Sequence, residues 1–428
     1  MSLPIQPNPG PAGHSNAPPV ALQDETRRRT LWLCGILHAF THLYNVALLP
    51  LYLLIQADLK LATVDQATLL VTVMMLAYFG PSYPMGLLAD RFSRKKILGI
   101  GLALNGLGFV GLASCRSYPM AIAWVILAGF GGSFYHPAAT AMVARSFPTN
   151  TGRALGLVAA GASVGFFIGP LYTAWRAAST GSWRSPILEL GLLGIAAALI
   201  FMIYAQEEKS ESVKPAAGVA HEKMFPNATL WMFFLGASLA FSLRDFTGWS
   251  MGSLGSLFMQ KARGLDLNFT GLALSSIFLA SIVSNPLFGG LSDRGRNRWL
   301  GLVLIIAAVT VAIFPRVPKT TIIPVLALYG FFFLASYPIT EAALMEAVPD
   351  SVRGRVFGAF ITISGMAGNL AHWAVGAWVK RLGPEAASPS SYYLLYLFLA
   401  ALVVLSLAGL PCLHAIRKRE VKSNAGAP

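Results

Sequence analysis

The stretch GLLADRFSRKK, Gly86 to Lys96, joins two apolar segments through a short polar run with one acidic residue and a cluster of basic ones. A related stretch, GGLSDRGRNR, occupies residues 289–298, and Asp90 and Asp293 are 203 residues apart. Two more pairs recur at nearly the same offset: Tyr135-His136-Pro137 with Ser336-Tyr337-Pro338, and Gly152-Arg153 with Gly354-Arg355. Three matches at one offset predict two parallel halves with the same fold, an arrangement that transporters use to rock around a central site.

The chain around these repeated stretches is apolar. Of its 428 residues 55% are hydrophobic and only 12% are charged, which is about half the charged share of a soluble domain. The mean hydropathy is +0.61. Apolar stretches near the roughly 20 residues that cross a bilayer recur along most of the chain. The composition therefore predicts an all-α membrane protein.

Twelve transmembrane helices are predicted, six in each half. Their ranges are 31–55, 67–88, 97–114, 120–144, 154–175, 187–204, 230–260, 270–291, 300–314, 321–347, 356–379 and 392–415. The predicted division is a disordered tail over 1–26, a bundle over 27–204, a linker over 205–227, a second bundle over 228–415 and a tail over 416–428. Residues 1–26 lack the basic start and apolar run of a signal peptide.

The basic residues are distributed unevenly among the loops. Of the 32 Lys and Arg residues, 21 fall in the tails, the linker and the even-to-odd loops, 10 fall in the opposite loops, and Arg244 lies within a helix. The positive-inside rule then predicts that both tails and the linker are cytoplasmic, in the cell inner (plasma) membrane. Basic residues in alternate loops, rather than on one face, argue against a nucleic-acid partner.

The loop Gly86 to Lys96 resembles the signature loop of the major facilitator superfamily, and the second copy strengthens the resemblance. We expect Gly86 to permit close helix approach, Asp90 to interact with a neighbouring helix end, and Arg91 and Arg94 to lie in cytoplasmic water. Asp293 and Arg294 take the same places in the second half. A basic loop that only fixes topology is the alternative.

The predicted fifth helix carries Gly161, Gly165 and Gly169-Pro170. This row of small residues resembles the antiporter motif of drug and proton exchangers. Rows of glycine also serve simply to pack helices closely. Exchange and packing therefore both stay open as interpretations of the row.

Several segments resemble the fosmidomycin-resistance branch of the same superfamily. They are Thr41 to Asn45, Gly132 to Arg145, Leu257 to Leu267, and Glu346 with Pro349. The resemblance implies secondary active transport without a cofactor. Val46 and Ala138 stand where that branch tends to have Asp and Glu, so a proton carrier would have to be another group.

Ionisable residues inside a span are costly and mark functional positions. Arg244 and Asp245 lie near the middle of the seventh predicted helix, and neighbours on a helix point about 100° apart, so we expect them not to neutralise each other. Arg244 is predicted to bind an anionic substrate group, and Asp245 and Glu341 are predicted to carry protons. A structural pair of Arg244 with Glu341 is the alternative.

The histidines provide further candidates. His42 and Asn45 share a face of the first helix, one turn after His38, and we expect His42 to contact substrate or carry protons. His136, before Pro137, and Tyr337, before Pro338, are predicted to contact substrate from corresponding places in the two halves. His372 is predicted to pack. Glu346 is predicted to act in gating, with water or Arg353 satisfying its charge.

These features predict a transporter rather than an enzyme, because no ATP-binding loop, metal-ligand spacing or activated nucleophile is visible. Cys34, Cys115 and Cys412 show no metal spacing and are predicted to pack. We expect a monomer in the bilayer that exports a small organic anion or amphiphilic drug-like compound in exchange for protons. An uptake permease, a proton-independent facilitator and a non-transporting receptor or scaffold are the alternatives.

Overall fold

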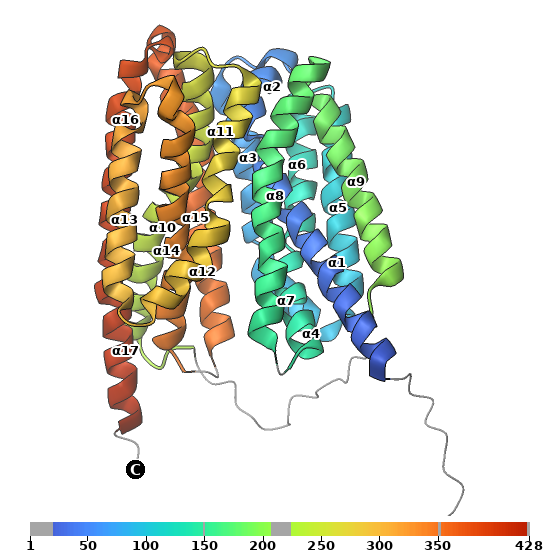
Figure 1. The fold of residues 1–428 in the computed structure, drawn as a ribbon, viewed down its shortest axis with the longest axis vertical. Helices are drawn as coiled ribbons and strands as arrows, with labels where there is room; N and C mark the ends of the chain where they lie inside the picture. The colour runs from blue at the N-terminus through green and yellow to red at the C-terminus, as the bar shows by residue number, and fades with distance from the viewer. Residues whose placement is uncertain (1–19, 149, 207–223, 350–351, 426–428) are drawn as a thin grey trace, which may run out of the picture.

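A computed structural model describes residues 20–148, 150–206, 224–349 and 352–425. Within these ranges the chain is nearly all helical and has no strand. Twelve helical segments run up and down in sequence (Figure 1), which confirms the predicted all-α membrane fold. The first and last described residues lie at the same end of the molecule in that view.

The first half holds six helical segments, several of them interrupted. They are α1 (Val20–Val46) with η1 (Leu49–Leu51) and α2 (Tyr52–Asp58); α3 (Val64–Phe79) with α4 (Ser82–Arg91); α5 (Arg94–Ser114); α6 (Tyr118–Gly132) with α7 (Tyr135–Ser146); α8 (Thr151–Thr180); and α9 (Arg184–Tyr204). Helix α1 begins earlier than the predicted Leu31, so residues 20–26, assigned to the tail, are helical. Residues 1–19 lie outside the described ranges.

The second half repeats this order. It consists of α10 (Ala228–Leu257) with the π-helical turn η2 (Phe258–Ala262); α11 (Leu267–Leu279) with α12 (Ser281–Ser292); α13 (Arg296–Ile313); α14 (Ile322–Glu346); α15 (Arg353–Leu382); and α16 (Tyr393–Leu405) with α17 (Gly409–Ala425). Short 3-10 turns, η3 to η7, fill the connections. Most of the predicted linker lies outside the described ranges, so the division into domains stays a prediction.

The break in the fourth segment has a local cause. Pro137 has no N–H to donate, and its ring crowds the carbonyl group of residue 133, four positions earlier. The helix is interrupted at Ser133 and Phe134, and α7 begins at Tyr135. The break therefore places His136 in the first turn of a new helix.

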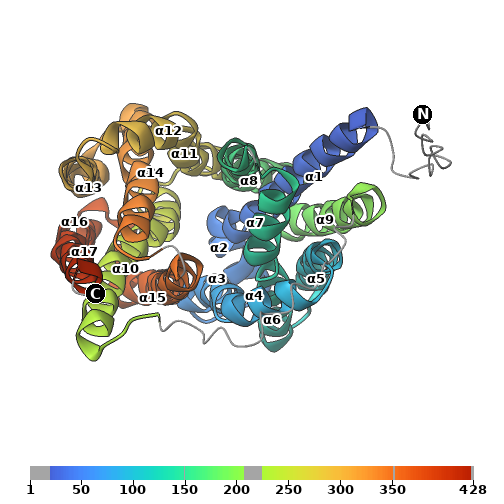
Figure 2. The same ribbon diagram turned by 90° about the horizontal axis from the view of Figure 1, so that it is seen from below.

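The two halves form two bundles that lie side by side (Figure 2). Between them α3 packs against α15, and α8 packs against α11. Ten of the described segments are long and apolar enough to cross a membrane by themselves, and α10 and α15 are not among them. These two helices carry many polar residues, and α10 is buried along much of its length. Polar side chains are tolerated there because they face protein rather than lipid.

Hydrogen bonds join the two halves on the side opposite the chain ends. Tyr52 and Ser253 are linked through their hydroxyl groups at 2.8 Å, and Thr72 donates to the carbonyl oxygen of Asn369 at 3.0 Å. The Nζ of Lys380 lies 3.2 Å from a carboxylate oxygen of Asp65. In the structure the halves are therefore held together at this end.

The glycine row of α8 packs against α1. A side chain at Gly161 would overlap the carbonyl oxygen of Gly35, and one at Gly165 would overlap that of Ala39. Only glycine permits such a backbone approach at these positions. The packing function of the row is thus observed, whereas its part in exchange stays a prediction.

We predict that Gly165→Leu lowers the stability of the protein and Gly156→Leu does not. The added side chain at position 165 meets the backbone of α1, a form of overpacking that typically costs about 1–3 kcal/mol. Gly156 lies on the same helix with open space around it. Thermal unfolding of both variants in one detergent measures the difference, and equal melting temperatures would contradict the packing assigned to Gly165.

Candidate functional site

Two groups of polar side chains lie within the spans, one in each half. The arginine cluster consists of Arg244 and Asp245 on α10 with Ser336, Tyr337, Thr340 and Glu341 on α14. The histidine cluster consists of His38 and His42 on α1 with His136 on α7. Between them, these clusters hold the ionisable residues that the sequence predicted to bind substrate or to carry protons.

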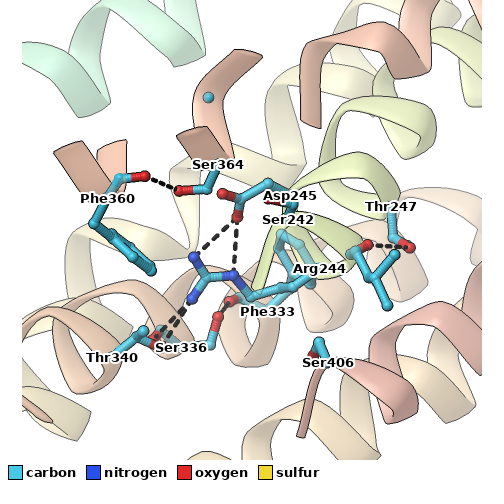
Figure 3. Close-up of polar contacts among 12 residues, drawn as sticks. Ser242, Arg244, Asp245, Thr247, Phe333, Ser336, Thr340, Phe360, Ser364 and Ser406 are labelled. Carbon is cyan, nitrogen blue, oxygen red and sulfur yellow. Dashed lines mark hydrogen bonds and ion pairs between the residues drawn. The ribbon is translucent and has the colours of Figure 1, made fainter. Parts of the chain in front are cut away.

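Arg244 is the centre of the arginine cluster and is only 1% exposed. Its Nε and Nη2 atoms each lie 2.9 Å from Oδ1 of Asp245. Its Nη1 donates to the hydroxyl group of Thr340 at 2.9 Å (Figure 3). The guanidinium also lies over the ring of Tyr337, 4.1 Å from the ring centroid. The charge is therefore paired with a carboxylate, hydrogen-bonded and stacked on an aromatic face.

The expectation that Arg244 and Asp245 cannot neutralise each other is wrong. Their Cα–Cβ directions diverge, but the long arginine side chain bends back so that the guanidinium reaches the neighbouring carboxylate. The alternative pair with Glu341 is also absent: the described ion pairs include none between Arg244 and Glu341. Glu341 lies near enough for electrostatic interaction with both partners.

Glu341 and Tyr337 are the half-buried members of the cluster, whereas Arg244 and Asp245 are buried. A half-buried carboxyl group can exchange protons with water, and a half-buried aromatic ring offers an apolar contact surface. The cluster thus combines a fixed, neutralised ion pair with a separate titratable carboxyl group beside it.

The histidine cluster brings side chains from two helices together. The Nε2 atoms of His38 and His42 are 3.0 Å apart, and Nδ1 of His38 lies 2.8 Å from the carbonyl oxygen of Val158 on α8. The ring centroid of His136 lies 5.3 Å from that of His38 and 5.4 Å from that of His42. His136 is exposed and His42 is half-buried, whereas Asn45 is buried one turn further along α1.

Sequence reasoning named His42 and His136 but set His38 aside, and it found no metal-ligand spacing. His136 lies on α7, about a hundred residues after His38 and His42 in the sequence, so no local pattern could reveal the group of three histidines. Ser336 and Thr340, which bind Arg244, were also missed. Thr340 lies three residues after Tyr337 on one face of α14, which was the available signal, whereas Ser336 accepts through its backbone carbonyl, which no sequence pattern marks.

The structure describes the first signature loop only in part. The side chain of Asp90 lies outside the described residues. Gly86 lies beside Pro137, where an added Cβ would make ordinary contact at 3.6 Å, so close approach does not require glycine there. Arg91 is exposed, whereas Arg94 is buried, contrary to the expectation that both lie in water.

In the second loop Arg296 is the central residue. It pairs with Asp293 at 3.0 Å and with Glu346 at 2.5 Å, and a surface cavity of about 430 Å³ opens beside this network. Arg294 is exposed. Arg353, expected to satisfy Glu346, interacts with it electrostatically and donates from Nε to the carbonyl oxygen of Met345. The gating function of Glu346 stays a prediction.

His372, predicted to pack, belongs to a polar chain at the contact between the halves. Its Nδ1 lies 2.6 Å from the hydroxyl group of Ser253, which in turn bonds with Tyr52 of the other half. Its Nε2 lies 3.2 Å from Oδ1 of Asn369. The residue is therefore buried, as expected, but it also takes part in the hydrogen bonding between the halves.

Comparison with known proteins agrees with this architecture. The sequence profile of the Major Facilitator Superfamily matches residues 31–371 and again residues 237–427. The chain belongs to the major facilitator superfamily. It is accordingly a transporter with a small-molecule substrate rather than an enzyme.

Relatives of this superfamily member are named for diverse substrates. The fosmidomycin resistance protein of Escherichia coli is 24% identical over 399 residues, which cover 90% of this chain and 95% of the relative. A probable sulfoacetate transporter of Cupriavidus necator is 24% identical over 84% of this chain and 89% of the relative. A probable L-galactonate transporter of Escherichia coli is 26% identical, but the match spans only 56% of each protein.

Solved structures show the same fold. A bacterial homolog of the human lysosomal transporter Spinster, in an inward-facing and unoccupied conformation, superposes with a TM-score of 0.75 at 16% identity. The superposition covers 93% of this chain and 98% of that one. At this identity the likeness establishes the fold and no more.

We predict that Arg244→Leu and Asp245→Leu are each strongly destabilising and that the double variant recovers much of the loss. Removing one partner leaves an uncompensated buried charge, which typically costs about 3–5 kcal/mol, whereas removing both leaves none. Thermal or denaturant unfolding of the four proteins gives the coupling energy.

The matched control is the pair Arg176 and Glu189, joined at 2.7 Å but with both side chains about a third exposed. Its single variants should have much smaller effects, because water screens exposed pairs. Simple addition of the two single effects at positions 244 and 245 would contradict the pairing described here.

Proposed function

We propose that this protein works by alternating access and exports a small organic anion or amphiphilic drug-like compound in exchange for protons. The observation that supports the proposal is the half-buried carboxyl group of Glu341 beside the neutralised pair of Arg244 and Asp245. A site of this kind can hold either a proton or a polar substrate group, which is the requirement for exchange.

Exchange follows from competition at Glu341. In the proposed cycle the carboxyl group of Glu341 holds a proton when no substrate is bound. A substrate with a cationic or hydrogen-bond-donating group favours the carboxylate and displaces the proton. Its apolar part then packs on the ring of Tyr337. Substrate and proton therefore occupy the site in turn.

The opposite wall of the site would come from the first half. We propose that His42, Asn45 and His136 contact the polar part of the substrate from α1 and α7. His136 is exposed and His42 is half-buried, so both are reachable, whereas buried Asn45 would require a local rearrangement. Rocking of the two bundles would open this site to each side of the membrane alternately.

A specific observation favours a second candidate, proton-coupled uptake of an anion. Four of the five N–H groups of Arg244 are directed at Asp245, Thr340 and Ser336, so an anionic substrate can form two bonds with the guanidinium only by taking the place of Asp245. The site then stays neutral only if Asp245 takes up a proton. Anion and proton would bind together and move in the same direction, as an uptake permease requires.

We also propose a membrane location, an orientation and an oligomeric state for the protein. We place both ends of the chain in the cytoplasm and the protein in the cell inner (plasma) membrane, on the strength of the basic loops. We propose that the transporting unit is a monomer, since each chain holds both halves of the site.

Transport into proteoliposomes with an imposed pH gradient distinguishes these mechanisms. A panel of labelled amphiphiles and small anions is tested with the gradient in each direction and with none. Export by exchange predicts flux opposite to the proton flow and its loss in Glu341→Gln. Uptake with protons predicts flux along the proton flow and its loss in Asp245→Asn.

The exposed loop residue Glu385 supplies the control, since Glu385→Gln removes a carboxylate outside the membrane interior and should leave transport unchanged. Monodisperse elution and unaltered melting are required of each variant. Transport that ignores the gradient in the parent and all variants would refute proton coupling and indicate a facilitator. The absence of any transport would favour a scaffold.

A further inference from the structure

We propose that His38, His42 and His136 form a binding site for a divalent transition-metal ion such as Zn²⁺. The three side chains each offer one ring nitrogen, and these nitrogens all lie within 4.8 Å of one another. The proposed transport mechanism uses His42 and His136 as substrate contacts and assigns proton coupling to the other half, so it neither requires an ion here nor supplies evidence for one. The metal site therefore stands on its own observations.

Two of the three ligands are already close to the spacing of a metal site. In a tetrahedral zinc site with Zn–N distances of about 2.0–2.1 Å, neighbouring ligand nitrogens lie about 3.3 Å apart. The Nε2 atoms of His38 and His42 are 3.0 Å apart. The third ligand, His136, is exposed and sits in the first turn of α7, so its ring has room to turn toward the other two.

The hydrogen bond of His38 sets its tautomer for metal binding. A carbonyl oxygen can only accept, so Nδ1 of His38 carries the proton in its 2.8 Å bond with Val158. Its Nε2 then carries a lone pair directed at the cluster. Metal-binding histidines typically have this arrangement, in which the outer nitrogen donates to a carbonyl group and the inner one binds the ion.

The cluster is not satisfied by hydrogen bonds within the protein. Because Nε2 of His38 is an acceptor, Nε2 of His42 must be the donor between them, and Nδ1 of His42 is left as an acceptor. That nitrogen is buried and has no hydrogen-bond partner. A buried acceptor without a partner is unfavourable. When both Nε2 atoms bind a metal ion, the proton of the His42 ring moves to Nδ1, and the ion replaces the hydrogen bond between the two rings.

Aromatic neighbours hold the rings in place. Tyr135 stacks on His38 with ring centroids 4.7 Å apart, and its hydroxyl group donates to the carbonyl oxygen of Cys34. Phe166 packs against His42 at a centroid distance of 4.4 Å. Rings fixed in this way lose little freedom when they bind an ion, which favours binding.

The ligand chemistry defines the class of ion. Three neutral imidazoles favour Zn²⁺, Cu²⁺, Ni²⁺ or Co²⁺ over Mg²⁺ and Ca²⁺, which prefer oxygen ligands. Three protein ligands leave a fourth position for water or another ligand, as in zinc sites that are open to solvent. His136 is the exposed member, so solvent reaches the site from its side.

The test is metal binding by the purified full-length protein, prepared with a histidine-free affinity tag and stripped with a chelator. Zn²⁺ is titrated in competition with a chromophoric chelator, and Co²⁺ is used as a spectroscopic probe of the ligand geometry. We expect one Zn²⁺ per chain at this site. With Co²⁺ we expect a visible absorption spectrum typical of an ion with a low coordination number. His136→Ala should weaken Zn²⁺ binding about tenfold or more and remove that spectrum.

His414 supplies the control, because it is exposed and lies on α17, in the other half of the molecule from the cluster. His414→Ala should bind Zn²⁺ as the parent does, and His42→Ala should lose binding together with His136→Ala. His136→Ala keeps the test decisive if His42→Ala does not fold. Equal Zn²⁺ affinity in His136→Ala, His414→Ala and the parent, or no binding in the parent, would overturn the proposal. No transport is measured, so a failure of proton coupling leaves this result unaffected.

Discussion

The structure depends on the requirement that a charge in the membrane interior must be paired. Arg244 meets it through Asp245, the hydroxyl group of Thr340 and the ring of Tyr337, and it is almost completely enclosed. Pairing inside the protein also lets α10 lie within the bundle, although it is less apolar than the ten segments that could cross a membrane by themselves. A helix of this kind has to be surrounded by protein, and its polar residues then define the interior of the second half.

The two halves share one fold but differ in chemistry. His136 and Tyr337 occupy corresponding places in the repeat, each immediately before a proline. In the first half this place belongs to a group of imidazoles, and in the second half it belongs to an ion pair with a neighbouring carboxyl group. The glycine row of α8 links local sequence to the first of these sites, because its close approach to α1 brings the carbonyl group of Val158 against His38. Packing and site chemistry are therefore set by the same contact.

The sequence predicted the fold well because repeats and apolar spans are local signals. It also identified Arg244, Asp245, Glu341 and Tyr337, since ionisable and proline-flanked residues stand out in apolar helices. It did not predict how they pair, because the reach of an arginine side chain and the rotation of α14 against α10 are three-dimensional properties. The same limit applies to His38, whose partner His136 is on another helix, and to Glu346, whose partner Arg296 begins the preceding long helix.

If the two halves rock about a site between them, distances across the two ends of the molecule must change in opposite directions. Spin labels at Arg116 and Glu385 report on the end where the halves are joined, and labels at Arg153 and Arg298 report on the other end, in a background without the native cysteines. All four residues are exposed. We expect protonation or substrate binding to lengthen one distance distribution and to shorten the other. Two distributions that stay fixed, or that lengthen together, would contradict alternating access.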